Sequence, residues 1–282
     1  MKIALSSEST CDLPKELLEK YNISTIPYCV ILGDEIVEDD ETVPTKIYEF
    51  VENTKKLPKT SAINEETYSE YFKKLLKDND AVIHITLSSG LSSSNSHAVS
   101  AAETLKNVYV IDSKSLSTGI ALLCIYARQL IDEGNSPEII VEKVKSRIPY
   151  IQASFVVERL DYLYKGGRCS RLALFGANLL KIRPQIVVKD GVMSPEKKFR
   201  GKMESVITKY CEETLEEFNT PDKSIAFITH TSATPEMINN AITAVKNAGF
   251  ENVYDTVAGG TITSHCGEHV LGILYFNDGK KI

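Results

Sequence analysis

The chain has 282 residues, 43% hydrophobic and 25% charged, which is typical of a globular protein and long enough for two lobes. Its net charge is −6 and no block of lysine or arginine stands out, which argues against nucleic-acid binding. The longest apolar stretch, residues 120–127, is too short to cross a bilayer and the N-terminus lacks a secretory pattern, so we expect an untargeted, cytoplasmic protein.

The first half of the chain alternates between strand-like and helix-like segments. Short apolar or β-branched runs predict strands at residues 2–5, 23–33, 81–87 and 108–112. Helical spacing predicts helices at residues 15–22, 43–54, 64–79, 94–106, 119–134 and 136–148. We expect Asp12 or a neighbour to cap the first helix, with Pro14 in its first turn, and Asn64 and Ser136 to cap the third and the sixth. This alternation predicts a mostly parallel sheet with helices on both faces.

The pattern changes after residues 149–151, and we place a lobe boundary near 150–155. Strand signals then appear in residues 153–160, 183–201, 224–230 and 251–276, and helical spacing in residues 202–218 and 234–249. A hairpin should turn at Asp190-Gly191, and Gly249 should end the second helix. The sequence therefore predicts a two-lobed α/β fold. An N-terminal lobe (residues 1–152) holds the mostly parallel sheet, and a C-terminal α/β lobe (residues 153–282) holds a mixed sheet.

A serine-rich turn, ITLSSGLSSSNSHAVSAAE at residues 85–103, joins a buried strand to a helix. Ligands bind parallel sheets beyond the carboxyl ends of the strands, where Ser6, Ser88 and Asp112 are expected. The hydroxyls could simply cap the helix, or they could bind an anionic group at its N-terminus. A nucleophile elbow needs G-x-S-x-G, but Ser94 occupies the second glycine position and no Asp/His pair can be assigned. Phosphate-loop motifs are absent, so a carboxylate suits this turn at least as well as a phosphate.

Three further segments offer candidate ligand contacts. Thr60 and Ser61 precede a helix, where they could act as ordinary caps. Arg168 follows two glycines, which let a ligand approach the backbone. His265 and His269 would share a face as metal ligands only on a helix, which the surrounding glycines make improbable, so a hydrogen-bonding role is favoured. Six cysteines form no C-x-x-C pair, and we expect neither a metal nor another cofactor.

Several of these segments occur in a characteristic order: SSESTCDLP, LPKTSAINEETY, SSGLSS, VIDSKSLSTG, ERLDYLYKGGRCSR, KIRPQIVVKDGV with KKFRG, and AGGTITSHCG. They are spread in this order across nearly the whole chain, and the series resembles the DegV family of bacterial fatty-acid-binding proteins. The resemblance implies a two-lobed α/β protein that holds one long-chain fatty acid. It also implies a partner, the ATP-dependent catalytic subunit of fatty acid kinase, which phosphorylates the bound acid to acyl phosphate for phospholipid synthesis. Transient contact with a membrane is compatible with that role.

The resemblance also implies a set of site residues. Thr60, with Ser61 beside it, and Ser92 match positions expected to contact the carboxylate. Arg168 and His265 match positions expected to support that network. Arg200 matches a basic position of the kinase-docking surface. The chain departs from the family pattern at LSSSNSHA, HCGEHV and TSAIN, where the family usually has LSGTYQSA, HTGPGA and TSQPS.

The chemistry of a fatty acid is compatible with this site. Burial of the tail gives about 0.8 kcal/mol per CH₂, and hydroxyl groups can satisfy the carboxylate while leaving it open to attack. The lining of the tail is not specified by the sequence, because apolar residues 120–127 and 172–180 could equally be ordinary core. We expect the chain to catalyse nothing by itself. The alternatives are a serine-dependent acyl-transfer or hydrolase enzyme with Ser92 or a neighbour as nucleophile, and a domain that handles sugars or phosphates.

Overall fold

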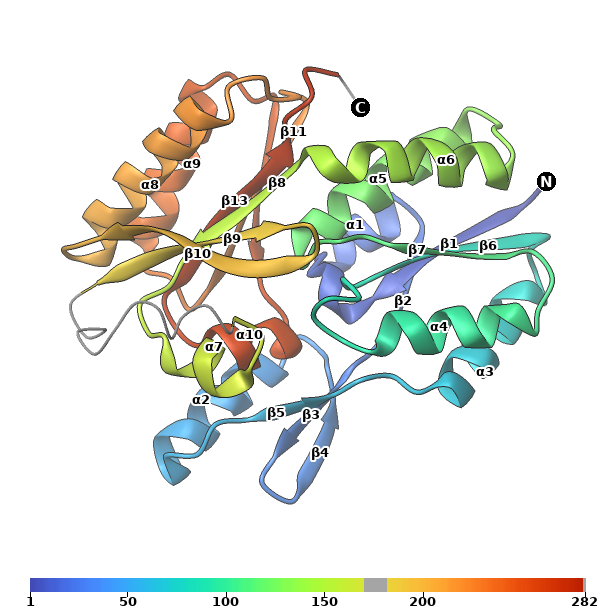
Figure 1. Ribbon diagram of the computed structural model, residues 1–282, viewed down its shortest axis with the longest axis horizontal. Helices are drawn as coiled ribbons and strands as arrows, with labels where there is room; N and C mark the ends of the chain where they lie inside the picture. Colours follow the sequence, from blue (N-terminus) through green and yellow to red (C-terminus); the bar gives the residue numbers. More distant parts are fainter. Residues whose placement is uncertain (170–181, 281–282) are drawn as a thin grey trace.

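The computed structural model describes residues 1–169 and 182–280, which form three sheets and their covering helices (Figure 1). The apolar segment 172–180 therefore lies outside the described residues. The first sheet is entirely parallel, with the order β2-β1-β6-β7. Its strands are β1 (Ile3–Glu8), β2 (Ile23–Ile26), β6 (Ala81–Thr86) and β7 (Val108–Asp112). The predicted parallel sheet is confirmed, and β6 at its centre is buried along its whole length, as a strand covered on both faces should be.

Helices cover both faces of the parallel sheet (Figure 1). One face carries α5 (Thr118–Asp132) and α6 (Pro137–Arg147), and the other carries α3 (Glu65–Leu76) and α4 (Ser94–Glu103). The Asn64 side chain caps α3 by accepting from the Thr67 N–H, as predicted. Ser136 occupies the cap position of α6 but makes no side-chain capping bond. The cap predicted near Asp12 is wrong, because α1 (Lys15–Lys20) begins after Pro14 with no side-chain cap.

The second sheet is mixed and has six strands in the order β10-β9-β8-β13-β11-β12. They are β8 (Ile151–Val156), β9 (Arg183–Lys189), β10 (Val192–Phe199), β11 (Ile225–Thr231), β12 (Asn252–Val257) and β13 (Val270–Phe276). Only the β11–β12 pair is parallel. The predicted hairpin is confirmed, with Asp190 and Gly191 both at positive φ in its turn. Helices α8 (Met203–Glu217) and α9 (Pro235–Asn247) cover one face, and α5 packs against the other.

The third sheet is small and antiparallel, with the order β4-β3-β5. It contains β3 (Cys29–Leu32), β4 (Glu35–Glu38) and β5 (Lys59–Ser61). It groups with α2 (Val43–Thr54), α7 (Asp161–Gly166) and α10 (Gly260–Cys266) below the junction of the larger sheets (Figure 1). Residues 23–33 thus form two strands in different sheets, not one strand region, because Pro27 interrupts the run and the chain changes direction there.

Helix α10 corrects the expectation that glycines would prevent a helix near His265. Backbone N–H groups at its start donate to buried carboxylates: Gly260 and Thr261 to Asp39, at 2.6 and 3.0 Å, and Gly259 to Asp12, at 2.9 Å. A Cβ at Gly260 would lie 2.3 Å from Val43 Cγ1. The glycines therefore allow α10 to pack closely against α2, and the two acids provide partners for the N–H groups that a helix start leaves without one.

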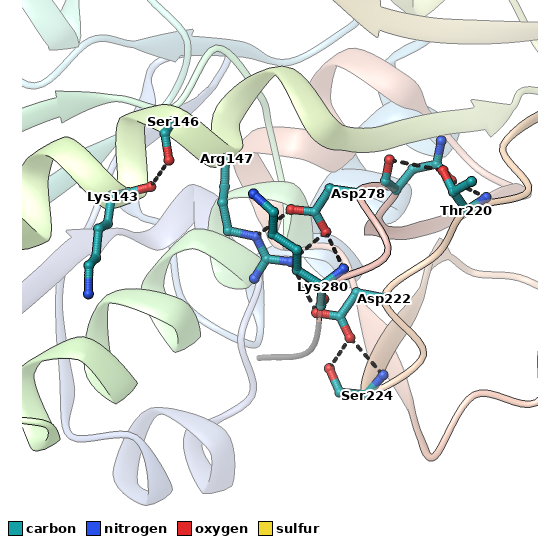
Figure 2. Close-up of polar contacts among 9 residues, drawn as sticks. Lys143, Ser146, Arg147, Thr220, Asp222, Ser224, Asp278 and Lys280 are labelled. Atoms are coloured by element: carbon teal, nitrogen blue, oxygen red, sulfur yellow. Dashed lines mark hydrogen bonds and ion pairs between the residues drawn. The ribbon is translucent and has the colours of Figure 1, made fainter.

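A buried arginine ties the end of α6 to the end of the chain that follows β13 (Figure 2). Arg147 donates to both carboxylate oxygens of Asp278, each at 2.9 Å, and to Asp222 at 3.1 Å. Its guanidinium also lies over the Phe276 ring, 3.8 Å from the centroid. β8 begins at Ile151, directly after this junction, so the proposed boundary between residues 1–152 and 153–282 falls within the first residues of that strand. No helix in the described part of the chain has the length and apolar character needed to cross a bilayer.

Candidate ligand pocket between the sheets

Four of the residues predicted for the site line one pocket. Thr60 lies on β5, Ser92 on the turn before α4, Arg168 on the turn after α7, and His265 on α10. We call this the head pocket; its other lining residues are Tyr28, Ala62, Leu87, Leu91, Leu116, Met193, Thr261, Ile262 and Cys266. Residues that are far apart in the sequence therefore meet at one place, as the interpretation of the serine turn requires.

A second, largely apolar pocket adjoins the head pocket and shares Leu116, Ile262 and Cys266 with it. We call it the tail pocket; it extends under the six-stranded sheet along Ala153, Phe155, Thr229, Val270 and Leu274, among others. The spaces between atoms measure about 480 Å³ in the head pocket and about 380 Å³ in the tail pocket, each counted with the solvent at its opening. Only about 40 and 30 Å³ of them admit the centre of a water-sized sphere, so both pockets are narrow slots.

Thr60 and His265 form one polar side of the head pocket. Thr60 Oγ1 lies 2.8 Å from His265 Nε2. Burial, together with the nearby Arg168 guanidinium, lowers the pKa of His265 to about 4, so its ring is neutral at neutral pH. The other ring nitrogen faces Gly166, where a Cβ would lie 2.7 Å from Nδ1. Gly166 is therefore needed for the close approach of the ring, which explains half of the Gly-Gly pair before Arg168.

Ser92 and Tyr28 form the opposite polar side. The Tyr28 hydroxyl donates to Ser92 Oγ at 3.1 Å, and the Ser94 N–H donates to the same oxygen at 3.2 Å. Since Ser92 Oγ already accepts two hydrogen bonds, its own proton is left to donate. Tyr28 belongs to no sequence motif and follows Pro27 between two strands. Its role depends on a contact between residues that are far apart in the chain.

Arg168 is the one cation among the described residues that line the head pocket. Its Nη1 donates to the Gly166 carbonyl at 2.7 Å, and its Nε donates to the Leu91 carbonyl at 3.4 Å. The guanidinium is thus held by backbone carbonyls of the serine-rich turn and of the end of α7, rather than by an acid. Its charge stays available to a ligand at the pocket mouth.

The remaining predicted residues lie elsewhere. Ser61 is exposed and its hydroxyl faces its own backbone at Ala62, because side chains alternate along β5 and Thr60 takes the inward position. Arg200 is exposed at the end of β10. His269 pairs with Glu158, with 2.5 Å between Nδ1 and Oε2, and lies after α10 rather than on the helix with His265. Within residues 1–169 and 182–280, no three His, Cys, Asp or Glu side chains cluster as metal ligands would.

The geometry does not favour a serine nucleophile. In the described structure, Ser92 Oγ has Tyr28 and the Ser94 backbone as its hydrogen-bond partners, and neither is a general base of the His type. His265 contacts Thr60 instead.

The fold and this site define a two-lobed α/β protein with a narrow apolar pocket beneath a polar mouth of hydroxyls and one guanidinium. The family model for DegV matches residues 2–278. This chain belongs to the DegV family, as the motifs in its sequence indicated.

Relatives agree with that assignment. A fatty acid-binding protein of Thermotoga maritima is 36% identical over 226 residues, which cover 77% of this chain and 78% of the relative. Protein DegV of Bacillus subtilis is 31% identical over 282 residues, which cover 98% of this chain and 99% of the relative. A solved structure of a fatty-acid-binding DegV family protein from Thermus thermophilus is 26% identical. It has a TM-score of 0.89 and covers 98% of this chain and 99% of its own. The predicted fold class is confirmed by this likeness.

Proposed function

We propose that this chain binds one long-chain fatty acid, with the carboxylate in the head pocket and the acyl tail in the tail pocket. We further propose that it presents the carboxylate to a separate, ATP-dependent fatty acid kinase subunit, which phosphorylates it to acyl phosphate. The chain itself then supplies binding and orientation, and the partner supplies ATP and metal. Relatives described as fatty-acid-binding proteins support the first part of this proposal.

The observation that carries the proposal is the direction of the hydrogen bonds at the head pocket. Ser92 accepts from Tyr28 and Ser94, so its proton points to a ligand. When neutral His265 carries its proton on Nε2, it donates to Thr60 Oγ1. The Thr60 hydroxyl proton is then also left to donate to a ligand. Two hydroxyl donors and the Arg168 guanidinium suit an acceptor with a negative charge, which a carboxylate is.

The tail pocket supplies most of the affinity in this proposal. Each buried CH₂ contributes about 0.8 kcal/mol before the costs of association. Because the pocket is narrow, a long acyl chain has to push lining side chains apart. Met193 and Ile262 are among the side chains that line the head pocket and would have to move. The flexible thioether chain of methionine changes its shape readily.

The head group remains reachable in this arrangement. Its expected partners are two neutral hydroxyls and a guanidinium that already donates to two backbone carbonyls. A carboxylate held in this way keeps an oxygen that can act as a nucleophile. A fully buried, bidentate ion pair would instead neutralise the charge of the carboxylate and occupy both of its oxygens. Phosphorylation by a partner requires such an accessible oxygen.

Alanine substitution of the two hydroxyl residues tests the site. In Thr60→Ala and Ser92→Ala, we expect fatty-acid affinity to fall by about 1–3 kcal/mol, or roughly 5- to 150-fold, because a buried carboxylate oxygen loses a donor. Affinity is measured by displacement of a fluorescent fatty acid. Native mass spectrometry, followed by solvent extraction of the purified protein, should show one fatty acid per chain.

Ser61→Ala is the matched control, since it removes a neighbouring hydroxyl that faces away from the pocket. It should bind as the wild type does. Equal affinity in all three variants would remove Thr60 and Ser92 from the site. Acyl phosphate made by the chain alone from ATP and oleate would contradict the division of labour with a kinase subunit.

A further inference from the structure

One hydroxyl group of the head pocket has no role in the ligand contacts proposed above. Thr261 lies in the first turn of α10 and lines the head pocket, although only 3% of the residue is exposed. Its Oγ1 is buried and has no hydrogen-bond partner among the described residues. An unpaired buried hydroxyl is costly, and such groups in native proteins are nearly always satisfied, so this one calls for a partner that binds in the pocket.

The other hydroxyl groups of α10 show that the helix itself does not leave them unpaired. Thr263 Oγ1 donates to the Ala258 carbonyl at 3.2 Å, and Ser264 Oγ donates to the Gly260 carbonyl at 2.7 Å. Both hydroxyls turn back to the backbone, and neither residue lines the head pocket or the tail pocket. Within α10, the hydroxyl of Thr261 is therefore the one that is left for a ligand.

A carboxylate of the protein already lies at the start of α10. Asp39 accepts from the Gly260 and Thr261 N–H groups, at 2.6 and 3.0 Å. A second negative group beside Thr261 would be repelled by this buried acid, because charges interact strongly where little water screens them. The carboxylate of the ligand therefore belongs at the other polar side chains of the pocket, and Thr261 suits a polar group without charge.

The position of Thr261 on α10 indicates which part of the ligand it meets. Thr261 and His265 are four residues apart on one face of the helix, which puts their Cβ atoms about 5–6 Å from each other. His265 Nε2 lies 2.8 Å from Thr60 Oγ1, one of the two hydroxyls proposed to hold the carboxylate. Thr261 lines the head pocket but not the tail pocket. It therefore faces the first carbons of the acid, next to the carboxylate, rather than the rest of the tail.

We propose that Thr261 binds a hydroxyl group on C2 or C3 of the ligand, so that the preferred ligands of this chain are 2- or 3-hydroxy fatty acids. This inference rests on the proposed fatty-acid-binding function and names the ligand class of the same site. A ligand hydroxyl suits Thr261 because either group can donate to the other and neither carries a charge. An unsubstituted acid places CH₂ groups against the unpaired threonine hydroxyl, and sites built for a hydroxyl discriminate against analogues that lack it.

Competition binding with four acids of equal chain length tests the ligand class. Tetradecanoate and its 2-, 3- and 12-hydroxy derivatives each displace a fluorescent fatty acid from the wild type. We expect the 2- or the 3-hydroxy acid to bind about tenfold more tightly than tetradecanoate, because it gives the buried Thr261 hydroxyl a partner. The 12-hydroxy acid should bind more weakly than tetradecanoate, because its hydroxyl enters the largely apolar tail pocket.

Thr261→Val replaces the hydroxyl with a methyl group of similar shape. This variant should bind tetradecanoate at least as tightly as the wild type does, and the preferred hydroxy acid about tenfold more weakly. Thr261→Ser keeps a hydroxyl and should keep the preference. Thr263→Val is the matched control, since it makes the same replacement at a hydroxyl that bonds to the Ala258 carbonyl outside both pockets. It should bind the four acids in the wild-type order.

The outcomes separate this inference from the function on which it rests. If the wild type binds neither the 2- nor the 3-hydroxy acid more tightly than tetradecanoate, the ligand class is overturned and fatty-acid binding stays intact. An unchanged preference in Thr261→Val would overturn the role of Thr261. Equal losses for tetradecanoate and for the hydroxy acid in Thr261→Val would also overturn it, and would assign this hydroxyl to the carboxylate. A wild type that binds none of the four acids overturns the proposed function, and this inference with it.

Discussion

Asp12 is a single residue that links the start of α10 to the start of α5. It adopts a left-handed backbone conformation after the short helix at Ser9–Cys11, and its carboxylate accepts from the Gly259 N–H and the Ser117 hydroxyl. Burial raises the pKa of Asp12 from its ordinary value to about 8. The folded protein therefore binds this proton over a pH range in which the unfolded chain does not.

The sign of the resulting pH dependence follows from linkage. An acid with a raised pKa contributes stability that is fully present below its unfolded pKa, near 4, and is lost as the pH rises through its folded pKa. Asp12→Asn preserves an acceptor for Gly259 and gives Ser117 an N–H partner without a titrating group. We expect the wild-type melting temperature to decline between pH 5 and 8, and the variant to decline less.

Thermal unfolding of both proteins at four pH values checks this prediction. Asp40→Asn is the matched control, since Asp40 is exposed and belongs to the same stretch of chain as the second α10-binding acid, Asp39. Parallel pH profiles for the wild type and Asp12→Asn would contradict the buried proton. Burial also raises the pKa of Glu8, to about 7, so Glu8 adds its own slope up to that pH. The region from pH 7 to 8 is therefore the most informative.

At the scale of elements, the tip of the β9–β10 hairpin crosses the serine-rich turn. The Ser88 hydroxyl donates to the Gly191 carbonyl at 2.7 Å. A Cβ at Gly90 would lie 2.5 Å from that same carbonyl oxygen, so the two backbones touch where a side chain cannot fit. Ser92 lies two residues after Gly90, and Met193 lies two residues after Gly191 on β10. This contact therefore positions both sides of the head pocket.

Gly90→Ala should separate these two elements. Its Cβ would meet backbone rather than a flexible side chain, so we expect a loss of about 1–3 kcal/mol in unfolding free energy, as for other overpacked sites. Fatty-acid affinity should fall as well, because the hairpin tip moves away from the pocket. Chemical denaturation and ligand displacement measure the two effects.

Ser89→Ala is the neighbouring control. It removes only the exposed contact between the Ser89 hydroxyl and Lys114, which should change stability by less than about 0.5 kcal/mol. An unchanged denaturation midpoint in Gly90→Ala would mean that the hairpin tip and the serine turn do not constrain each other.

The same elements show what sequence analysis could and could not predict. Local signals were sufficient for the Asp190-Gly191 turn, the Asn64 cap and the buried β6 strand, because each depends on neighbouring residues. They failed for α10, where distant carboxylates and close packing outweigh the glycines. Family motifs predicted Thr60, Ser92, Arg168 and His265, which line one pocket, whereas Tyr28 is linked to Ser92 by a long-range hydrogen bond that no motif indicates.

At the scale of the whole molecule, α5 joins the two large sheets. Its apolar residues pack on β1 and β6 from one side and on β8 and β13 from the other, in one continuous hydrophobic core. The head and tail pockets lie along this shared core, with Leu116 and Ser117 just before α5 in their lining. A ligand between the sheets therefore contacts both proposed lobes.

The proposed kinase partner has to approach the mouth of the head pocket from outside. Arg200 is exposed and follows β10, whose other end supplies Met193 to the pocket. A strand of eight residues spans on the order of 25 Å, so a partner docked on Arg200 can cover the strand and reach the mouth without entering the pocket. Charge reversal in Arg200→Glu should therefore abolish acyl phosphate formation by the added kinase subunit and ATP, while fatty-acid affinity stays unchanged.

Lys106→Glu makes the same charge change at an exposed position after α4, and should leave both measurements at the wild-type level. Full kinase activity with Arg200→Glu would exclude this end of β10 as the docking surface. A parallel loss of fatty-acid affinity would instead mean that Arg200 acts on the pocket.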